Sequence, residues 1–321
     1  GYHHRKNQKN RDEVSMTKQY NRIMPGRRSM FFEQCIDGGF IGGDWDFSTD
    51  LSNDLTEDWH DFNAKYIPIY LANKPGASKI AAGLACGKLW TICKGLNIND
   101  VVLMPDGHGN YAVGTITSEY YFAGKDTALP HRRRVNWNEE RIPRSSMSQA
   151  LKNSSGSLGT CCDLSAYADE INNLINPHGN EAETSDFQDI FALEKHLEDF
   201  LVTNWQNTEF GKQFEIYEDD DGQTGQQYPT DTGPMDILAI SKDKKRLLVV
   251  ELKRNKTSDA VVGQILRYMA YVQEMLCEEG QTVEGAIVAL EDDQKLRRSL
   301  SMLNNVHFYR YRVSFRLERT C

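Results

Sequence analysis

The stretch 235–276 contains two short apolar runs followed by a long amphipathic segment, and this order restricts the fold more than any other part of the chain. Met235–Ile240 and Leu247–Leu252 have the length and composition of buried strands, and the polar Ser241–Arg246 between them predicts a tight hairpin. Apolar residues then recur at helical spacing from Thr257 to Leu276. The pattern predicts a mixed α/β domain built around this hairpin.

Three charged residues, Asp236, Glu251 and Lys253, occupy these two strands. Residues two apart in a strand share a face, so Glu251 and Lys253 project together, and the hairpin brings Asp236 alongside them. Two carboxylates can hold a hard divalent cation such as Mg²⁺ or Mn²⁺. A neighbouring lysine can orient or deprotonate a water molecule and stabilise charge on a phosphate. The arrangement indicates phosphodiester hydrolysis, although charged residues at strand ends are also common without any function.

An upstream helix, predicted over Phe187–Trp205, adds further carboxylates. Glu194 falls within the apolar stripe of this helix and Glu198 lies on its flank. A carboxylate on a buried face costs free energy unless it is paired or bound to a metal. Glu194 is therefore the candidate third metal ligand and Glu198 the alternative. A salt bridge with Lys195 or Lys253 would explain either residue equally well.

The motif Pro234-Met235-Asp236, followed after fourteen residues by Glu251-Leu252-Lys253, resembles the PD-(D/E)xK nuclease superfamily. Gln264 and Tyr268 in the next helix are similar to a companion Gln-x-x-x-Tyr motif of that superfamily. The resemblance implies a magnesium site at Asp236 and Glu251 with help from Glu194, a water-activating Lys253, and strand positioning by Gln264 and Tyr268. Tyr268 could also be a core residue and Gln264 a surface residue.

The remaining C-terminal elements fit the same architecture. A strand is predicted over Val283–Leu290, a helix over Asp292–Leu303 and a strand over Val306–Phe315. The order of these elements is similar to the three-layer α/β restriction-endonuclease-like fold, and it looks most like the Mrr-type and mismatch-endonuclease branches. This resemblance covers roughly residues 187–317.

The N-terminal half interleaves aromatic residues with arginines on predicted short strands. The residues in question are Tyr120, Arg132, Arg133, Arg134 and Trp137, which follow a predicted hairpin of residues 97–105 and 111–116. Guanidinium groups can contact phosphates and aromatic rings can stack on bases, so this pattern suits nucleic-acid binding. A β-barrel with aromatic residues inside and arginines in solvent would produce the same spacing.

Roughly residues 18–168 resemble the PUA/EVE-like barrels of predicted restriction-system proteins. The resemblance is carried by segments that include Phe40-Ile41-Gly42, Asp44-Trp45-Asp46 and Arg134-Val135-Asn136-Trp137. It implies a β-barrel-like α+β domain that holds an extruded, often modified base in an aromatic pocket. Trp45, with Asp50 near it, is the candidate pocket wall, unless Trp45 is simply a core tryptophan.

Composition sets the remaining expectations. The 321 residues predict two domains, with a tail at 1–17, an N-terminal domain at 18–172, a linker at 173–186 and a nuclease domain at 187–321. The net charge of −9 comes from the C-terminal half, including the acidic loop 218–221, so any DNA-binding surface must be locally basic. We expect no membrane span. Seven cysteines without metal-ligand spacing suggest a reduced, cytoplasmic protein.

These observations together predict a magnesium-dependent DNA endonuclease of the modification-dependent restriction type, which acts against foreign DNA such as that of phages. Alternatives are a structure- or mismatch-specific repair endonuclease, a nucleotide-gated effector, and a non-catalytic nucleic-acid-binding protein. RNA remains an open alternative as the substrate. Because one active site cuts one strand, double-strand cleavage implies a homodimer.

Overall fold

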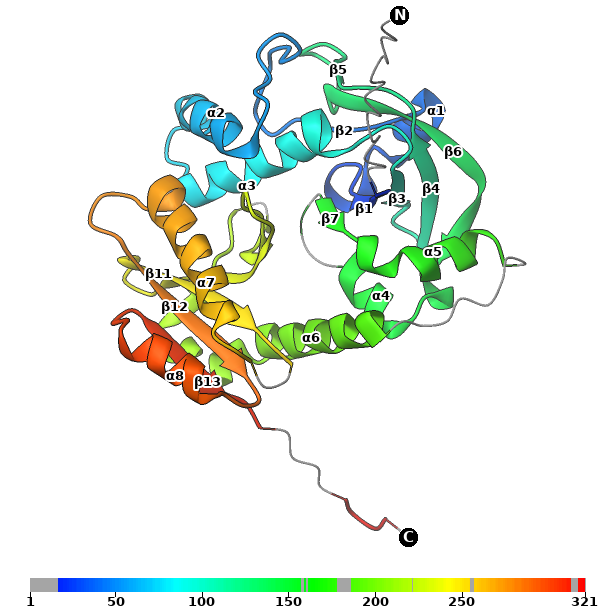
Figure 1. Cartoon of the computed structure of the whole chain (residues 1–321). Coiled ribbons are helices and arrows are strands. Elements are labelled where there is room, and N and C mark those ends of the chain that lie inside the picture. The colour runs from blue at the N-terminus through cyan, green and yellow to red at the C-terminus, as the bar shows by residue number, and fades with distance from the viewer. Residues whose placement is uncertain are drawn as a thin grey trace, which may run out of the picture.

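The computed structural model describes residues 17–156, 159, 161–177, 186–220, 222–254, 257–312 and 317–320, with the backbone alone for 186–193. It contains two sheet-bearing halves, connected by helices α2 (Trp59–Asn73) and α3 (Lys79–Trp90) on one side and by α6 (Asp186–Thr203) on the other (Figure 1). The expected tail 1–17 lies outside the described residues except for Thr17, as does most of the expected linker 173–186.

The N-terminal half is built on a curled seven-stranded sheet in the order β2–β6–β4–β3–β1–β7, with β5 paired to β6 (Figure 1). Its strands are β1 (Tyr20–Ile23), β2 (Phe40–Gly43), β3 (Val101–Pro105), β4 (Asn110–Ile116), β5 (Tyr121–Phe122), β6 (His131–Pro143) and β7 (Cys161–Asp163). β1 and β3 pair in parallel, and the other pairs are antiparallel. The predicted hairpin of residues 97–116 is confirmed as β3–β4.

The long strand β6 bends this sheet. Its first residues pair with β2 and β5, and its later residues pair with β4. The register between β4 and β6 shifts at Ala112/Gly114, and such a bulge increases the local twist. The helices of this half are α1 (Phe32–Gly38), α2 (Trp59–Asn73), α3 (Lys79–Trp90), α4 (Gln149–Ser155) and α5 (Ala168–Ile175).

The C-terminal sheet has the order β13–β12–β11–β10–β8, with β9 also paired to β10. Its strands are β8 (Phe214–Ile216), β9 (Gln226–Tyr228), β10 (Met235–Ser241), β11 (Arg246–Leu252), β12 (Thr282–Ala289) and β13 (Val306–Arg310). β10 and β11 form the antiparallel hairpin that the two apolar runs predicted, whereas β11, β12 and β13 run parallel. The expected mixed α/β architecture is therefore confirmed in this half.

Helices cover both faces of the C-terminal sheet and complete three layers. α6 (Asp186–Thr203) packs on one face, where Leu197 and Leu201 contact the buried side chains of β10–β12. α7 (Ala260–Tyr271), which continues as a π-helical turn over Val272–Leu276, packs on the other face with α8 (Gln294–Ser301). These helices match the predicted ones, apart from differences of a few residues at their ends.

One hydrophobic core joins the two halves. It combines buried side chains of α2 and α3 with those of α7 and β10–β12. Two glycines on α3 allow the close approach: a Cβ at Gly83 would collide with the Tyr228 hydroxyl and lie 2.7 Å from Leu276 Cδ2, and a Cβ at Gly87 would lie 2.9 Å from Pro229 Cγ. Residues on both sides of the expected linker thus share a core.

The helices within the described part of the chain include none with the length and apolar character needed to cross a membrane.

Candidate active site

The β10–β11 hairpin brings Asp236 and Glu251 together at one end of the sheet. Asp236 Oδ2 accepts a hydrogen bond from the main-chain N–H of Leu252 at 2.7 Å, and the Asp236 N–H donates to Glu251 Oε1 at 3.4 Å. Glu251 is 1% exposed, whereas Asp236 is half-buried. Lys253 follows β11 directly and is also half-buried. The three residues of the predicted motif therefore lie at the same place.

The pKa values of the Asp236 and Glu251 carboxyl groups are both raised. Burial is the main cause for Asp236, with a further contribution from Glu198, and the nearby Lys253 opposes the rise. Burial is likewise the largest cause of the raised pKa of Glu251, and the negative charge of Asp236 is the second cause. The positive charge of Lys253 again lowers the pKa. Buried neighbouring carboxylates are stabilised by a cation, and their oxygens are the ligands that Mg²⁺ prefers. The donor set therefore fits a divalent metal ion.

Glu198 on α6 links this helix to the hairpin. It is 3% exposed, and its Oε1 accepts from Lys195 Nζ at 2.8 Å and from Gln226 Nε2 at 2.6 Å. Its Oε2 accepts from Gln227 Nε2 at 2.5 Å, and the same Gln227 nitrogen lies 3.3 Å from Asp236 Oδ1. A single amide group thus bridges the carboxylate of α6 and the carboxylate of β10.

Glu194, one turn earlier on α6, lies at the same site. Its Oε1 accepts a hydrogen bond from the main-chain N–H of Arg254 at 3.3 Å. Both glutamates raise the pKa of Asp236, and Glu198 contributes more than Glu194. The two alternatives drawn from the sequence are therefore both placed near the motif, and Glu198 also forms the salt bridge with Lys195 that was considered for this helix.

Gln226 and Gln227 on β9 were not singled out from the sequence. Successive residues of a regular strand point to opposite faces, yet both amides reach Glu198. The irregular backbone of Gln227, with φ of 52°, accompanies this arrangement. Positive φ at a residue other than glycine is uncommon and often occurs at functional sites. The sequence signal was weak, because two glutamines next to a turn-rich acidic loop suggest only solvent exposure.

Tyr268 and Gln264 act on the segment before Asp236. The Tyr268 hydroxyl donates to the main-chain oxygen of Pro234 at 3.1 Å and is itself hydrogen-bonded by Gln264. Tyr268 is 5% exposed and belongs to the shared core, as the alternative explanation of this residue anticipated. The pair thus fixes the position of the chain that enters β10.

The three consecutive arginines of β6 have different surroundings. Arg133 is fully buried and donates to the main-chain oxygens of Ile92, Leu96 and Ser118. A guanidinium enclosed in this way cannot reach a phosphate, so the DNA contact expected for Arg133 does not fit its placement. Arg132 is half-buried over the ring of Phe40, at 3.7 Å from its centroid. Arg134 is the exposed one of the three.

The aromatic residues Tyr120 and Trp137, expected to stack on bases, are half-buried and make internal contacts. The Tyr120 hydroxyl lies 2.8 Å from His131 Nδ1, and the Trp137 indole N–H donates to the main-chain oxygen of Cys35 at 2.9 Å. Trp45, with φ of 51°, packs against Gly43 and two core clusters. The Asp50 side chain is exposed and accepts from the Ser52 N–H at 2.9 Å. Trp45 is therefore a half-buried residue at the edge of the core.

A second group of potential metal ligands occurs among the described residues, at Asp58, His60 and Asp61, whose ligand atoms lie within 4.8 Å of one another. Asp58 caps α2 by accepting from the Asp61 N–H at 2.8 Å, and His60 Nε2 lies 2.7 Å from Glu274. Helix capping and this ion pair explain the group without a metal.

Comparison with protein families gives two matches. Residues 194–310 match the Endonuclease NucS C-terminal domain. Residues 22–165 match a domain of unknown function, DUF8426. The first match confirms the expectation of an endonuclease domain in the C-terminal half. The second assigns no activity to the N-terminal half, where the PUA/EVE-like resemblance stays a prediction. No curated protein matches the chain.

The similar solved structures include three of low sequence identity to this chain. A repair endonuclease from Pyrococcus abyssi is 17% identical with a TM-score of 0.30, over 64% of this chain and 66% of that one. An EndoMS–dsDNA2 complex is 16% identical with a TM-score of 0.32, over 67% and 66%. EndoMS in the apo form is 16% identical with a TM-score of 0.28, over 67% and 65%. The chain thus spans slightly less than two thirds of the length of these structures.

Proposed function

We propose that this chain, which carries a domain of the endonuclease NucS C-terminal family, is a metal-dependent DNA endonuclease that recognises a mismatch or an irregular DNA structure. The observation that carries the proposal is the convergence of Asp236, Glu251 and Lys253 from the hairpin with Glu198 from α6. Carboxylates and a lysine in this arrangement suit phosphodiester hydrolysis better than a structural role, because packing alone does not require neighbouring buried acids.

Each residue has a specific role in the proposed reaction. Asp236 and Glu251 would hold a Mg²⁺ or Mn²⁺ ion, and Glu198 or Glu194 would supply a further carboxylate beside it. Such an ion, when bound, polarises the phosphate and lowers the pKa of water. Lys253 would orient the attacking water and stabilise the charge that develops on the phosphate. Tyr268 and Gln264 would hold the Pro234 segment, and with it Asp236, in a fixed position.

The choice between repair and restriction depends on the N-terminal half. Modification-dependent restriction was predicted from a resemblance to Mrr-type nucleases and to base-reading barrels. The matched endonuclease family supports the repair alternative better. The internal contacts of Arg133, Tyr120 and Trp137 also argue against an open base-reading pocket at these residues. Of the three consecutive arginines on β6, Arg134 is the exposed one, and we propose that it contacts DNA.

The test uses the purified full chain with Mg²⁺ or with a chelator. Four substrates of equal length are compared: a perfect duplex, a duplex with one mismatch, a duplex containing hydroxymethylcytosine, and an RNA duplex of the same sequence. We expect Mg²⁺-dependent cleavage of the mismatched DNA at a rate at least about tenfold above that of the perfect duplex. A tenfold ratio corresponds to the free energy of about one contact that the protein makes with the mismatch and not with the perfect duplex.

Each outcome has a distinct meaning. Preferential cleavage of the modified duplex would restore the restriction interpretation, and preference for RNA would change the substrate class. Cleavage in the presence of chelator would contradict the metal site. We also expect a homodimer on DNA if both strands are cut, which sedimentation of the protein–DNA complex would reveal as two chains per duplex.

A further inference from the structure

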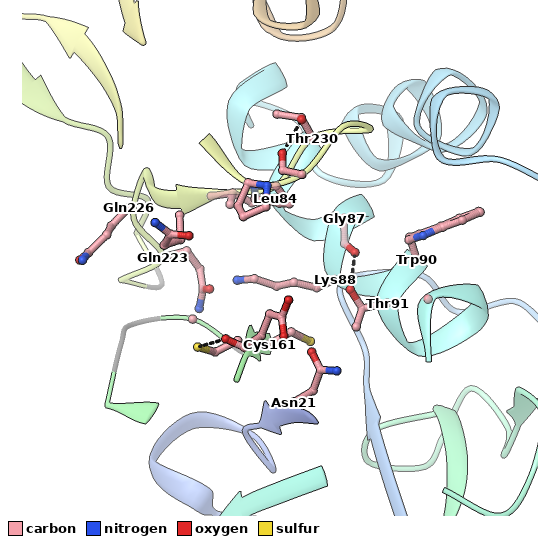
Figure 2. A pocket seen from close by; sticks show the side chains of 18 of the residues that line it. Asn21, Leu84, Gly87, Lys88, Trp90, Thr91, Cys161, Gln223, Gln226 and Thr230 are labelled. Atoms are coloured by element: carbon pink, nitrogen blue, oxygen red, sulfur yellow. Dashed lines mark hydrogen bonds between the residues drawn. The ribbon is translucent and has the colours of Figure 1, made fainter. Parts of the chain in front are cut away.

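A cavity of about 400 Å³ lies between the two halves (Figure 2). Its lining comes from α3 and β1 of the N-terminal half and from β9 and the segment before it in the C-terminal half. The volume is in the range that holds a small ligand. Gln226 and Gln227, the two amides that hold Glu198 at the candidate active site, also line this cavity.

The wall formed by the N-terminal half includes the buried Lys88 and the exposed Asp163. Lys88 on α3 is 8% exposed and extends into the cavity in Figure 2. Its ammonium group lies close to Gly159, where a Cβ would be 3.5 Å from Lys88 Nζ. Arg22, which is 2% exposed, donates to the main-chain oxygen of the same Gly159 at 2.9 Å. Lys88 thus places a buried ammonium group in the lining of the cavity, and lysine is a common ligand of phosphate.

Two amide groups face the same cavity with unused hydrogen-bonding capacity. Asn21 is 6% exposed, and its Nδ2 is buried with no hydrogen-bond partner among the described residues. The Gln223 Oε1 atom is also buried, and it too has no hydrogen-bond partner among the residues that the structure describes. A buried donor or acceptor that stays unpaired costs free energy, so such groups point to a ligand. One donor and one acceptor together complement the edge of a nucleobase, which offers both.

We propose that this cavity binds a nucleoside 5′-monophosphate, or a ligand that contains one. The phosphate would lie near Lys88, and the base edge would meet the Asn21 amide donor and the Gln223 oxygen. Because Gln226 and Gln227 belong to both the cavity wall and the acidic site, the ligand would also influence nuclease activity. This last part rests on the proposed nuclease function, whereas the binding site itself does not.

Binding is measured by calorimetry and thermal denaturation on the full chain in chelator, so that no cleavage is required. The probes are AMP, GMP, CMP and UMP, their four nucleosides, and inorganic phosphate. We expect at least one monophosphate to bind and raise the Tm, and the matching nucleoside and phosphate to bind at least about tenfold more weakly. If none of the four monophosphates binds, the proposal is wrong.

Variants locate the site. Lys88→Met removes the charge and should weaken binding at least about tenfold, a loss typical of a charged hydrogen bond. Lys94→Met is the matched control, because Lys94 lies in the next turn and pairs with Glu57 at 3.5 Å, outside the cavity lining. Asn21→Leu replaces the unpaired amide with a side chain of similar size, so it should raise the Tm of the ligand-free protein while reducing nucleotide binding. This second variant keeps the test decisive if Lys88→Met does not fold.

Two further results would overturn the assignment. Unchanged binding in both Lys88→Met and Asn21→Leu would place the nucleotide elsewhere. Binding of a short single-stranded oligonucleotide, but of no mononucleotide, with the same loss in Lys88→Met would assign the cavity to the substrate strand.

The binding proposal and the nuclease proposal can fail separately. If a monophosphate binds and the chain cleaves no nucleic acid, the binding site stands and the nuclease proposal fails. If it cleaves, adding the monophosphate should change the rate, and an unchanged rate would remove the coupling through Gln226 and Gln227.

Discussion

The Asp236 carboxylate serves two parts of the molecule at once. One of its oxygens is held by the Leu252 N–H at the end of the hairpin, and the other lies 3.3 Å from the Gln227 amide that also binds Glu198. The first contact fixes the carboxylate relative to β11, and the second relates it to α6. Lys253 has a simpler setting, since it directly follows β11 and is only half-buried. This makes Lys253 the residue best suited to separate chemistry from folding.

We therefore expect Lys253→Ala to leave the fold intact and to reduce cleavage by at least about a hundredfold, which is a loss typical of removing one group that stabilises a transition state. Lys242→Ala is the matched control, because Lys242 is exposed on the turn of the same hairpin. The Lys242→Ala variant should cleave at the rate of the wild type. Single-turnover cleavage rates and circular dichroism spectra of both variants provide the measurement. A folded Lys253→Ala variant with normal activity would remove Lys253 from the proposed mechanism.

His131 is buried and hydrogen-bonded at both ring nitrogens. Its Nε2 lies 2.7 Å from the Phe47 main-chain oxygen and its Nδ1 2.8 Å from the Tyr120 hydroxyl, and burial lowers its pKa below 6.5. The neutral ring donates through Nε2 and accepts at Nδ1. The unfolded chain binds a proton more readily, so the contribution of His131 to stability is complete above its unfolded pKa and is lost as the pH falls towards the folded pKa.

The corresponding measurement is the Tm from pH 8 to pH 5. We expect the Tm of the wild type to fall relative to that of His131→Gln below about pH 6.5, the ordinary pKa of histidine, because the raised pKa values of Asp236 and Glu251 affect both proteins alike. His131→Gln retains an amide donor and acceptor but has no titratable group, so its Tm should fall less over the same interval. Parallel curves for the two proteins would show that another group is responsible.

At the scale of elements, α3 is the helix that brings the two halves together. We expect Gly83→Ala to lower the free energy of unfolding by about 1–3 kcal/mol, because the new methyl group meets Tyr228 and Leu276 in a packed core. Gly263→Ala on the exposed side of α7 meets Arg267 Nη1 alone, at 3.5 Å, and should stabilise the protein by up to about 1 kcal/mol through helix propensity. Urea denaturation of both variants tests the opposite signs. Stabilisation by Gly83→Ala would show that the helices can move apart.

The sequence allowed the prediction of the β10–β11–α7 unit because its two strands are short apolar runs around a polar turn, and because α7 has one buried face and one polar face. α3 lacks such a pattern. Residues from Ile80 to Leu89 are almost all buried, since this helix packs against α2 on one side and the C-terminal half on another. A helix surrounded by protein shows no periodic alternation of apolar and polar residues, so local sequence reasoning did not detect it.

The candidate site was predictable where its residues belong to regular strands. Asp236, Glu251 and Lys253 followed from strand periodicity and hairpin geometry. Gln226 and Gln227 did not, because their role depends on a left-handed residue in a three-residue strand and on a helix that is distant in sequence. The opposite error occurred at Arg133, where an arginine expected at the surface satisfies three carbonyl groups in the interior.

At the scale of the whole molecule, the shared core predicts cooperative unfolding. Side chains of α2 and α3 lie in the same cluster as those of α7 and β10–β12, so neither half can lose its structure without exposing apolar surface of the other. We expect a single calorimetric transition whose van't Hoff enthalpy equals the calorimetric enthalpy. Two separated transitions would show that the halves are independent folding units despite this core.

The glycine face of α3 also limits how this protein could be rebuilt. A nuclease half that is cut out at the segment joining α5 to α6 would leave behind the helices that cover Tyr228, Pro229 and Leu276. Any engineered fusion of this cleavage domain to a different recognition domain would have to include α2 and α3 in the transplant. By the same reasoning, an ancestor of this chain could not have exchanged its N-terminal half freely. The incoming domain would need a helix with glycine at the positions of Gly83 and Gly87.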